Sequence, residues 1–351
     1  MHDTLPAPPD GIHLEDVEVG RLIEFGRISV TKEEIIKFAL AYDPQTMHTD
    51  EEEAKKTIVG RLCASGFHSC AIMMRMLVDG LLSGQGWTSL GSPGIDECRW
   101  LKPLFPDQIL TGRVICTEKR ALASRPEVGL LKVKFEMVDQ AGDVIMTWAS
   151  NQMLKVRHPG AKVEGGGKGD RPPALVSVWD GPQGPAPDPT RNFFEDRQIG
   201  EIYDLGSHTF TADEIITFAK QFDPQPFHLT EEGGKASLFG GLCASGWHTA
   251  AIWIRQFVAY RQKIEREIQA AGVPVARYGP SPGFLNLRWL KPVYPGDTLT
   301  FRGRTAAKID LKSRPDRGIL QTDSQARNQK GELVFNIRGQ ILAERREPYR
   351  P

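Results

Sequence analysis

An aspartate and a histidine five residues apart occur twice in the sequence, each time around an Asp-Pro-Gln triplet. The first copy is DPQTMH, with Asp43 and His48, and the second is DPQPFH, with Asp223 and His228. An imidazole can accept or donate a proton near neutral pH, and a carboxylate can orient a water molecule or polarise the ring. Across a short proline-containing loop, both groups can converge on one water or one substrate proton. They are therefore candidate catalytic pairs.

A serine and a glycine begin an apolar stretch downstream of each pair, and each stretch is predicted to form a helix. In Ser65-Gly66 and Ser245-Gly246 the glycine stands where free backbone N–H groups and the helix dipole point at a bound oxyanion. Glycine also lets a substrate carbonyl come close to the backbone. Acid, imidazole and helix start together suit the addition or removal of water beside a thioester carbonyl, where an enolate-like charge must be held.

Other roles for these residues stay open at this point. Asp before Pro is a common turn former, and a duplication copies turns as readily as sites. His68 and His248, three residues after each serine, are candidates for lining the same pocket or for packing in the core, and we expect core packing. A metal centre on Asp43, His48 and His68 has no signature spacing, so we expect no metal. A Ser65, His48, Asp43 nucleophilic triad lacks the sequence of a nucleophile elbow.

The chain of 351 residues is organised as a tandem repeat. TKEEIIKFALAYDPQTMH faces TADEIITFAKQFDPQPFH, and GRLCASGFHSCAIMMR faces GGLCASGWHTAAIWIR, both at an offset of 180 residues. RWLKP recurs at an offset of 189, so the second half has gained nine residues between about Tyr260 and Pro282. So long a period indicates a domain duplication, with domains at 1–157 and 191–351. The Gly- and Pro-rich segment 158–190 is predicted to be a linker.

Each half is predicted to contain one buried helix followed by antiparallel strands. Thr31 and Thr211 are expected N-caps of a short helix that ends at the Asp-Pro step, because proline disfavours the helical conformation at the residue before it. The next helix begins near Ser65 or Ser245 and is apolar almost all round, which is typical of a central helix. Strand-forming stretches fill the rest of each half. This layout is α+β, with a curved sheet wrapped around its helix.

Composition gives no sign of a nucleic acid or a membrane as partner. Lysines and arginines together number 44, as do aspartates and glutamates, so the formal net charge is zero. The five cysteines form no CxxC pair, which favours reduced thiols over disulfides or zinc ligands. No run of about 18 apolar residues occurs, and the first residues lack the basic and apolar regions of a secretory signal. We expect a cytoplasmic protein that acts on a small molecule.

Three segments of the second half, with their counterparts in the first, resemble one enzyme family. FAKQFDPQPFHLTEE, ASLFGGLCASGWHTAAI and LRWLKPVYPGDTL are similar to the MaoC-like dehydratases, the hot-dog-fold family that includes (R)-specific enoyl-CoA hydratases. The resemblance covers both halves and implies a double hot-dog fold, two tandem hot-dog domains that pair as one pseudo-dimer. It implies two sets of site residues, each with a catalytic pair and an oxyanion-binding glycine: Asp43, His48 and Gly66, then Asp223, His228 and Gly246.

The sequence departs from the family pattern at three kinds of position. Gln45 and Gln225 stand where the pattern usually has asparagine. The second half keeps a Pro-Gly-Asp turn, whereas the first has Asp107 in place of the glycine. The small residue six positions after the histidine is kept as Ala54 in the first half but is Gly234 in the second. Each half is thus imperfect in a different place, and whether one site or both are active stays open.

The resemblance also implies a substrate and a reaction. An acyl thioester is expected, and the reaction is reversible hydration of 2-enoyl-CoA to (R)-3-hydroxyacyl-CoA, with coenzyme A as part of the substrate and no separate cofactor. Ser65 and Ser245 are expected to bind the substrate. Arg125, Arg314 and Arg317, in the SRPEVG and SRPDRG turns, are candidate ligands of CoA phosphates, or else solvated arginines of exposed hairpins.

Two rival functions remain beside this one. An acyl-CoA thioesterase on the same fold would use the same aspartate to activate water against the carbonyl carbon, and a non-catalytic acyl-CoA-binding protein would bind the ligand without turnover. Acyl carrier protein in place of coenzyme A, and a homodimer of the whole chain, are also left open.

Overall fold

The computed structural model describes residues 8–160, 178–179, 184–188 and 190–350, so most of the predicted linker at 158–190 lies outside the described residues. Eleven strands of the described chain form one antiparallel sheet. The first half contributes β1 (Leu22–Ser29), β2 (Ser89–Gly91), β3 (Gly94–Trp100), β4 (Ile109–Leu122), β5 (Arg125–Asp139) and β6 (Val144–Lys155). The second contributes β7 (Ile202–Thr209), β8 (Gly283–Trp289), β9 (Thr298–Asp310), β10 (Arg317–Arg327) and β11 (Leu333–Glu344).

The strand order repeats on both sides of one central junction. It runs β1-β4-β5-β6-β3-β8-β11-β10-β9-β7, with β2 paired to β6 beside this path. Read outward from β3 and β8, the two halves have the same order of corresponding strands. The duplication seen in the sequence is therefore a duplication of fold, and the two halves share one continuous sheet.

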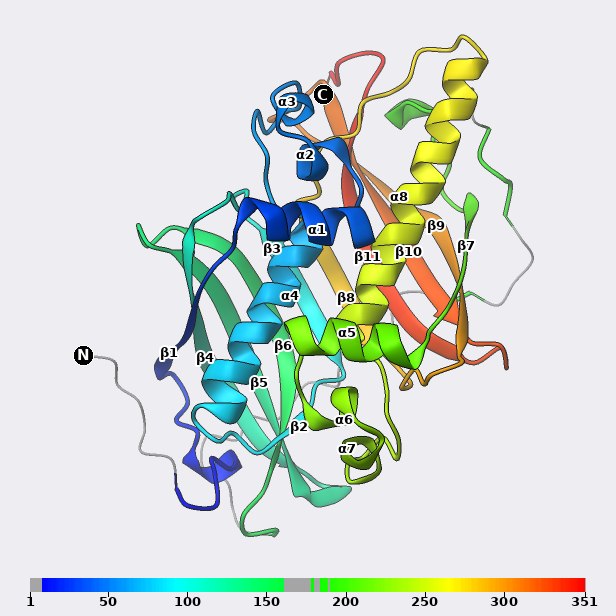
Figure 1. The fold of residues 1–351 in the computed structure, drawn as a ribbon. Helices are drawn as coiled ribbons and strands as arrows, with labels where there is room; N and C mark the ends of the chain where they lie inside the picture. Colours follow the sequence, from blue (N-terminus) through cyan, green and yellow to red (C-terminus); the bar gives the residue numbers. More distant parts are fainter. Residues whose placement is uncertain (1–7, 161–177, 180–183, 189, 351) are drawn as a thin grey trace.

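Helices cover one side of this sheet, and the two long ones, α4 and α8, lie against it (Figure 1). The helices of the first half are α1 (Lys32–Tyr42), α2 (Thr46–Thr49), α3 (Glu51–Ala54) and α4 (Gly66–Leu77), which is followed by a wide π-helical turn, η2 (Val78–Ser83). Those of the second half are α5 (Ala212–Phe222), α6 (Pro226–Leu229), α7 (Glu231–Lys235) and α8 (Gly246–Ala270). Short 3-10 turns, η1 (Leu14–Asp16) and η3 (Phe194–Asp196), precede β1 and β7.

The predicted helix starts are confirmed. The Thr31 hydroxyl accepts a hydrogen bond from the Glu34 backbone N–H, and the Glu34 carboxylate accepts one from the Thr31 N–H, a reciprocal capping box that Thr211 repeats. α1 ends at Tyr42, and Asp43, the residue before the proline, is its C-cap. Most side chains of α4 are buried, as its all-round apolar sequence predicts.

The extra residues of the second half lengthen its central helix. From the equivalent glycines, helical backbone runs for 12 residues in α4 and for six more in η2, whereas α8 alone has 25 residues. In the first half Gly80 packs so tightly on β1 that a Cβ there would lie 2.7 Å from the Gly26 nitrogen. Helical backbone ends at Ser83 in the first half, whereas α8 continues to Ala270 and contacts α1 and α4 of the other half.

Two equivalent glycines allow β3 and β8 to pair at the junction. Gly94 has φ +152° and Gly283 has φ +144°, values that favour glycine. A Cβ on Gly94 would lie 2.1 Å from the carbonyl oxygen of Leu287, and one on Gly283 would lie 2.0 Å from that of Cys98. Either side chain would push the two central strands apart.

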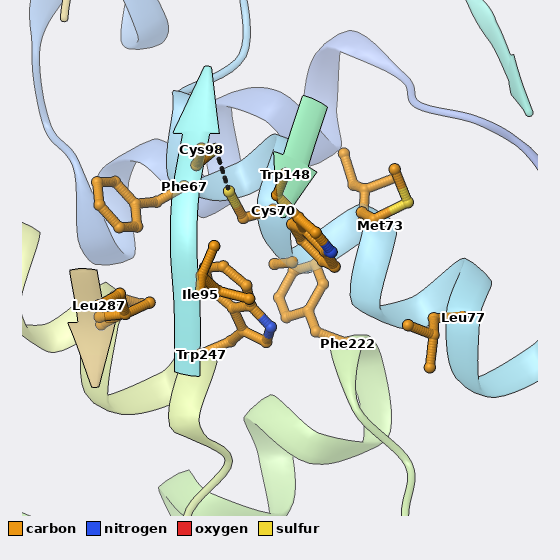
Figure 2. Packing of buried hydrophobic residues seen from close by; sticks show 14 of the residues in the cluster. Phe67, Cys70, Met73, Leu77, Ile95, Cys98, Trp148, Phe222, Trp247 and Leu287 are labelled. Atoms are coloured by element: carbon orange, nitrogen blue, oxygen red, sulfur yellow. Dashed lines mark hydrogen bonds between the residues drawn. The ribbon is translucent and has the colours of Figure 1, made fainter. Parts of the chain in front are cut away.

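One hydrophobic core extends through both halves. Trp148 of β6 stacks on Trp247 of α8, with ring centroids 5.2 Å apart, and Phe67 of α4 stacks on Phe284 of β8 at 5.7 Å. Figure 2 shows Phe67, Trp148 and Trp247 of this core, with Cys70 of α4 among them. Because the aromatic contacts cross the junction, neither half buries its apolar face alone. None of the helices in the described ranges combines the length and apolarity needed to cross a membrane.

Candidate active site

Asp43 lies at the C-terminal end of α1 with both carboxylate oxygens held by neighbours. Its Oδ1 accepts a hydrogen bond from Nε2 of Gln45 (2.8 Å), and its Oδ2 accepts one from the Ser65 hydroxyl (2.6 Å). Only 3% of Asp43 is exposed. The carboxylate therefore has one orientation, fixed from its own loop and from the start of α4.

His48 lies on the short helix α2 with its two ring nitrogens in different environments. Nδ1 is 2.8 Å from the backbone oxygen of Cys63. A carbonyl can only accept, so Nδ1 carries the hydrogen, and Nε2 of the neutral ring has a free lone pair. Nε2 lies 3.8 Å from Oδ2 of Asp43. This separation leaves the two groups close enough to share one water molecule.

The second half repeats this arrangement almost atom for atom. Asp223 accepts hydrogen bonds from Gln225 (2.9 Å) and from the Ser245 hydroxyl (2.6 Å). Nδ1 of His228 donates to the Cys243 carbonyl (2.7 Å), and its Nε2 is 3.5 Å from Oδ2 of Asp223. Both copies of the loop thus have the geometry of a site.

The glycine after each serine provides a free backbone donor. Ser65 caps α4 by accepting a hydrogen bond from the Phe67 N–H, so Gly66 is the first residue of the helix and its N–H has no acceptor within the helix. A Cβ on Gly66 would lie 2.4 Å from Cε2 of Trp100, and one on Gly246 would lie 2.4 Å from Cε2 of Trp289. Glycine is therefore required at both helix starts.

A cavity adjoins each site, and each is built from both halves. The first, of about 340 Å³, contains Asp43, His48 and Gly66, and the second half supplies its far wall from α8, from the segment 279–284 and from β11. The second, of about 310 Å³, contains Asp223 and His228, and the first half supplies its far wall from α4, from the segment 89–93 and from β6. Neither site is complete within one half.

Comparison with known proteins supports the resemblance seen in the sequence. The sequence model of the MaoC like domain matches residues 16–136 and again 195–325, which is well over half of the chain. The chain belongs to the MaoC-like domain family. Membership supports hydration or dehydration as its general type of reaction.

Individual relatives agree with this assignment. The uncharacterized protein YdeM of Bacillus subtilis is 28% identical over 127 residues, which are 36% of this chain and 87% of YdeM. A MaoC domain protein from Chloroflexus aurantiacus is 16% identical, with a TM-score of 0.77 over 96% of this chain and 98% of that one. Rv0216 of Mycobacterium tuberculosis, which has a double hotdog fold, is 15% identical, with a TM-score of 0.65 over 95% and 99%. This MaoC-like chain is therefore a double hot-dog protein.

The residues predicted to bind substrate lie outside both cavities. Ser65 and Ser245 are fully buried and donate to their aspartates, so they hold the acid in place. Arg125 is exposed at the start of β5, and Arg314 and Arg317 both pair with Asp316. Their role as phosphate ligands stays a prediction.

His68 and His248 lie in the core, as the sequence predicts. His68 stacks on Phe38 with ring centroids 4.4 Å apart, and His248 stacks on Phe218 at 4.7 Å. Burial lowers the pKa of each imidazole to about 3. Both rings are therefore neutral over the physiological range and contribute packing.

Three features of the MaoC-like sites escape sequence reasoning. Gln45 counts as a departure from the family pattern, yet its amide orients Asp43. The carbonyl that fixes His48 is backbone and carries no side-chain signal. Asp107, in place of the turn glycine, adopts φ +63°, in the left-handed region that aspartate tolerates better than most residues. Among the described residues, no three His, Cys, Asp or Glu side chains gather as metal ligands would.

Proposed function

We propose that this protein catalyses the reversible hydration of 2-enoyl-CoA to (R)-3-hydroxyacyl-CoA. The observation that carries the proposal is the gap between Oδ2 of Asp43 and Nε2 of His48. It is 3.8 Å wide, opens into the cavity that Gly66 also lines, and has a second copy in the other half. Two bases around one water, beside a helix-start N–H, suit the addition of water to an enoyl thioester.

The proposed hydration begins with the thioester carbonyl oxygen bound to the Gly66 N–H. Water held between Asp43 and His48 attacks C3, and the electrons of the C2–C3 double bond move to the carbonyl oxygen to give an enolate. One proton of the water passes to the Asp43 and His48 pair. The same pair returns a proton to C2 as the enolate collapses, so the enzyme ends in its starting state. Dehydration follows the reverse path.

The residues around Asp43 and His48 hold these two side chains in place for the proposed reaction. The Cys63 carbonyl keeps the hydrogen of His48 on Nδ1, which leaves Nε2 to accept the proton of the water. Ser65 and Gln45 each occupy one oxygen of Asp43 and keep Oδ2 turned toward His48. Holding reacting groups in place removes part of the entropic barrier.

Both sites are proposed to be active. Corresponding hydrogen bonds in the two halves differ by 0.1 Å at most, from Gln45 and Gln225, from the two serines and to the two cysteine carbonyls. Both cavities adjoin their acid, histidine and glycine. The groups that act on the substrate all belong to the protein, so the proposed chemistry needs no cofactor beyond the coenzyme A of the substrate.

One assay tests this proposal against its two rivals. Crotonyl-CoA and longer 2-enoyl-CoA substrates are incubated with the full chain, the loss of enoyl absorbance and the release of free thiol are both recorded, and the product is resolved on a chiral column. We expect loss of absorbance, no free thiol and the (R) product. Thiol release would instead indicate a thioesterase, and ligand-induced thermal stabilisation without turnover would indicate a binding protein.

A further inference from the structure

The two cavities differ in charge at one position of their far walls. Arg261, on the extended part of α8, lines the first cavity. Fifteen residues after the helix-start glycine of the other half, the equivalent position is Leu81, which is 2% exposed and part of the apolar core. The α4 wall of the second cavity is formed by apolar residues, among them Met74 and Leu77. A cation is therefore present beside one site and absent from the same place beside the other.

The Arg261 guanidinium is held in place by Tyr278. It lies over the Tyr278 ring, with its Cζ 3.4 Å from the ring centroid. Throughout the part of the chain that the structure describes, no ion pair within 4 Å involves Arg261, although the Glu265 carboxylate, four residues along α8, attracts it electrostatically. Burial lowers its pKa below the usual value, but a guanidinium stays protonated in proteins. A guanidinium has five N–H donors, so beside its hydrogen bond to Tyr278 it keeps other donors, and these match a carboxylate in bidentate geometry.

The loop that carries Asp43 is fastened to the same turn of α8. Nε2 of Gln262, the residue after Arg261, donates to the Pro44 carbonyl (2.9 Å).

The wall of the first cavity also contains Thr322, a hydroxyl side chain of β10 at the position where the first half has Val133. Leu81 and Val133 of the first half are thus replaced by Arg261 and Thr322 in the second half. Both polar residues line the cavity of the first site.

The asymmetry favours the acyl group over coenzyme A as the partner of Arg261. Coenzyme A is common to every substrate, so residues that bind it are expected in both cavities. Lys102 and Lys291 fit that expectation, since they are equivalent, line their respective cavities and are half exposed. Arg261 has no such counterpart and therefore faces the part of the substrate that differs between the sites.

We propose that the first cavity accepts acyl thioesters whose acyl chain ends in a carboxylate, and that Arg261 binds this carboxylate. The second cavity, with its apolar wall, accepts uncharged acyl chains. This assignment rests on the proposed function for the class of ligand, an acyl thioester. With two different cavities, one chain would accept a wider range of acyl groups than a chain with two identical sites.

Binding measurements test the assignment apart from turnover. Calorimetry with the full chain compares adipyl-CoA, which ends in a carboxylate, with hexanoyl-CoA, its uncharged counterpart of equal length, in the wild type and in Arg261→Leu. We expect Arg261→Leu to weaken adipyl-CoA binding at the first site about 10- to 100-fold, the range for a hydrogen bond to a charged group, and to leave hexanoyl-CoA binding unchanged. Arg266→Leu, an exposed arginine of the same helix, is the matched control and should change neither affinity.

Each result separates this assignment from the proposed function. Saturated thioesters cannot be hydrated, so a preference for adipyl-CoA that depends on Arg261 would support the assignment even if no hydration occurs. Hydration of 2-enoyl-CoA with equal affinity of wild type and Arg261→Leu for adipyl-CoA would overturn the assignment and leave the function intact. Equal weakening of both CoA ligands, with no effect on adipyl- and hexanoyl-pantetheine, would make Arg261 a phosphate ligand and also overturn it.

Discussion

Ser65 donates its hydroxyl hydrogen to Oδ2 of Asp43 across 2.6 Å while the same oxygen atom of the serine caps the helix α4. One residue therefore fixes both the acid and the helix start whose N–H groups face the cavity. Replacing Ser65 should therefore disturb the placement of the Asp43 carboxylate relative to the Gly66 N–H.

The change Ser65→Ala is expected to lower the hydration rate at the first site and to destabilise the protein by about 1–3 kcal/mol, because a cap is lost and Oδ2 of a buried carboxylate loses a donor. Enoyl-CoA turnover and urea denaturation measure the two effects, with Asp223→Asn as background to silence the second site. Ser69→Ala removes a hydroxyl that, among the described residues, donates to the Ser65 carbonyl over 3.4 Å, and it should cost less stability; because Ser69 lines the cavity, it serves as the control for stability alone. Equal turnover of Ser65→Ala and its background would contradict a positioning role for Ser65.

The change Gly66→Ala is expected to place a Cβ 2.4 Å from Cε2 of Trp100. The Cβ and the indole cannot both keep these positions, and Trp100 lines the same cavity as Gly66. We expect loss of turnover at this site and a stability cost of about 1–3 kcal/mol for overpacking. Thermal unfolding of Gly66→Ala, Trp100→Phe and the double variant measures the coupling. If Gly66→Ala destabilises the Trp100→Phe background as much as the wild type, the contact with Trp100 is not the reason why glycine is required at position 66.

The buried histidines predict a loss of stability in acid. His68 and His248 have a pKa of about 3 in the folded protein and about 6.5 in the unfolded chain, which therefore binds more protons between these values. Their contribution is complete above pH 6.5 and is lost as the pH falls toward 3. Between pH 6.5 and 4.5 the free energy of unfolding should fall by about 2–3 kcal/mol for each histidine. Urea denaturation measures the free energy of unfolding across this pH range. This free energy should depend less steeply on pH in His68→Phe than in wild type, and still less steeply in the double variant with His248→Phe. A steeper or unchanged dependence would contradict the assignment of both rings as neutral.

The junction predicts that the halves unfold together. Arg288 of β8 reaches across to Asp96 of β3, with Nη2 2.5 Å from Oδ1, and donates to the Ile95 carbonyl at 2.9 Å. Arg288→Met should cost about 1.5–3 kcal/mol for these charge-assisted bonds. Tryptophan fluorescence during urea unfolding should show a single transition shifted to lower urea. Asp96→Asn keeps a hydrogen-bond acceptor for Arg288 and should shift the transition less than Arg288→Met does. Two separate transitions in wild type would show that the halves fold independently.

Sequence reasoning reaches the features with a local cause. The capping box at Thr31, the helix end at Asp43 and the helix start at Gly66 each follow from neighbouring residues, and all are confirmed. The family resemblance adds the double hot-dog pairing. The nine extra residues are also placed by the repeat, although not as a continuation of α8.

What sequence reasoning misses depends on contacts between distant segments. The Cys63 carbonyl meets His48 because two loops pack together, and no side-chain pattern marks a backbone acceptor. Trp253 and Arg261 of the second half line the cavity of the first site, which becomes visible only when both halves share one sheet. Ser65 is expected to bind substrate, yet its position behind Asp43 is decided by the angle at which α4 meets the loop.

The central claim is that Asp43 and Asp223 activate water for addition to enoyl thioesters. Its most direct test is the rate of 2-enoyl-CoA hydration by wild type, by Asp43→Asn, by Asp223→Asn and by the double variant, with circular dichroism to verify folding. The proposed two-site mechanism predicts partial loss from each single change and a loss of at least about 100-fold from both together, the lower end of what acid–base catalysis contributes. A folded double variant that hydrates substrate at the wild-type rate would contradict it.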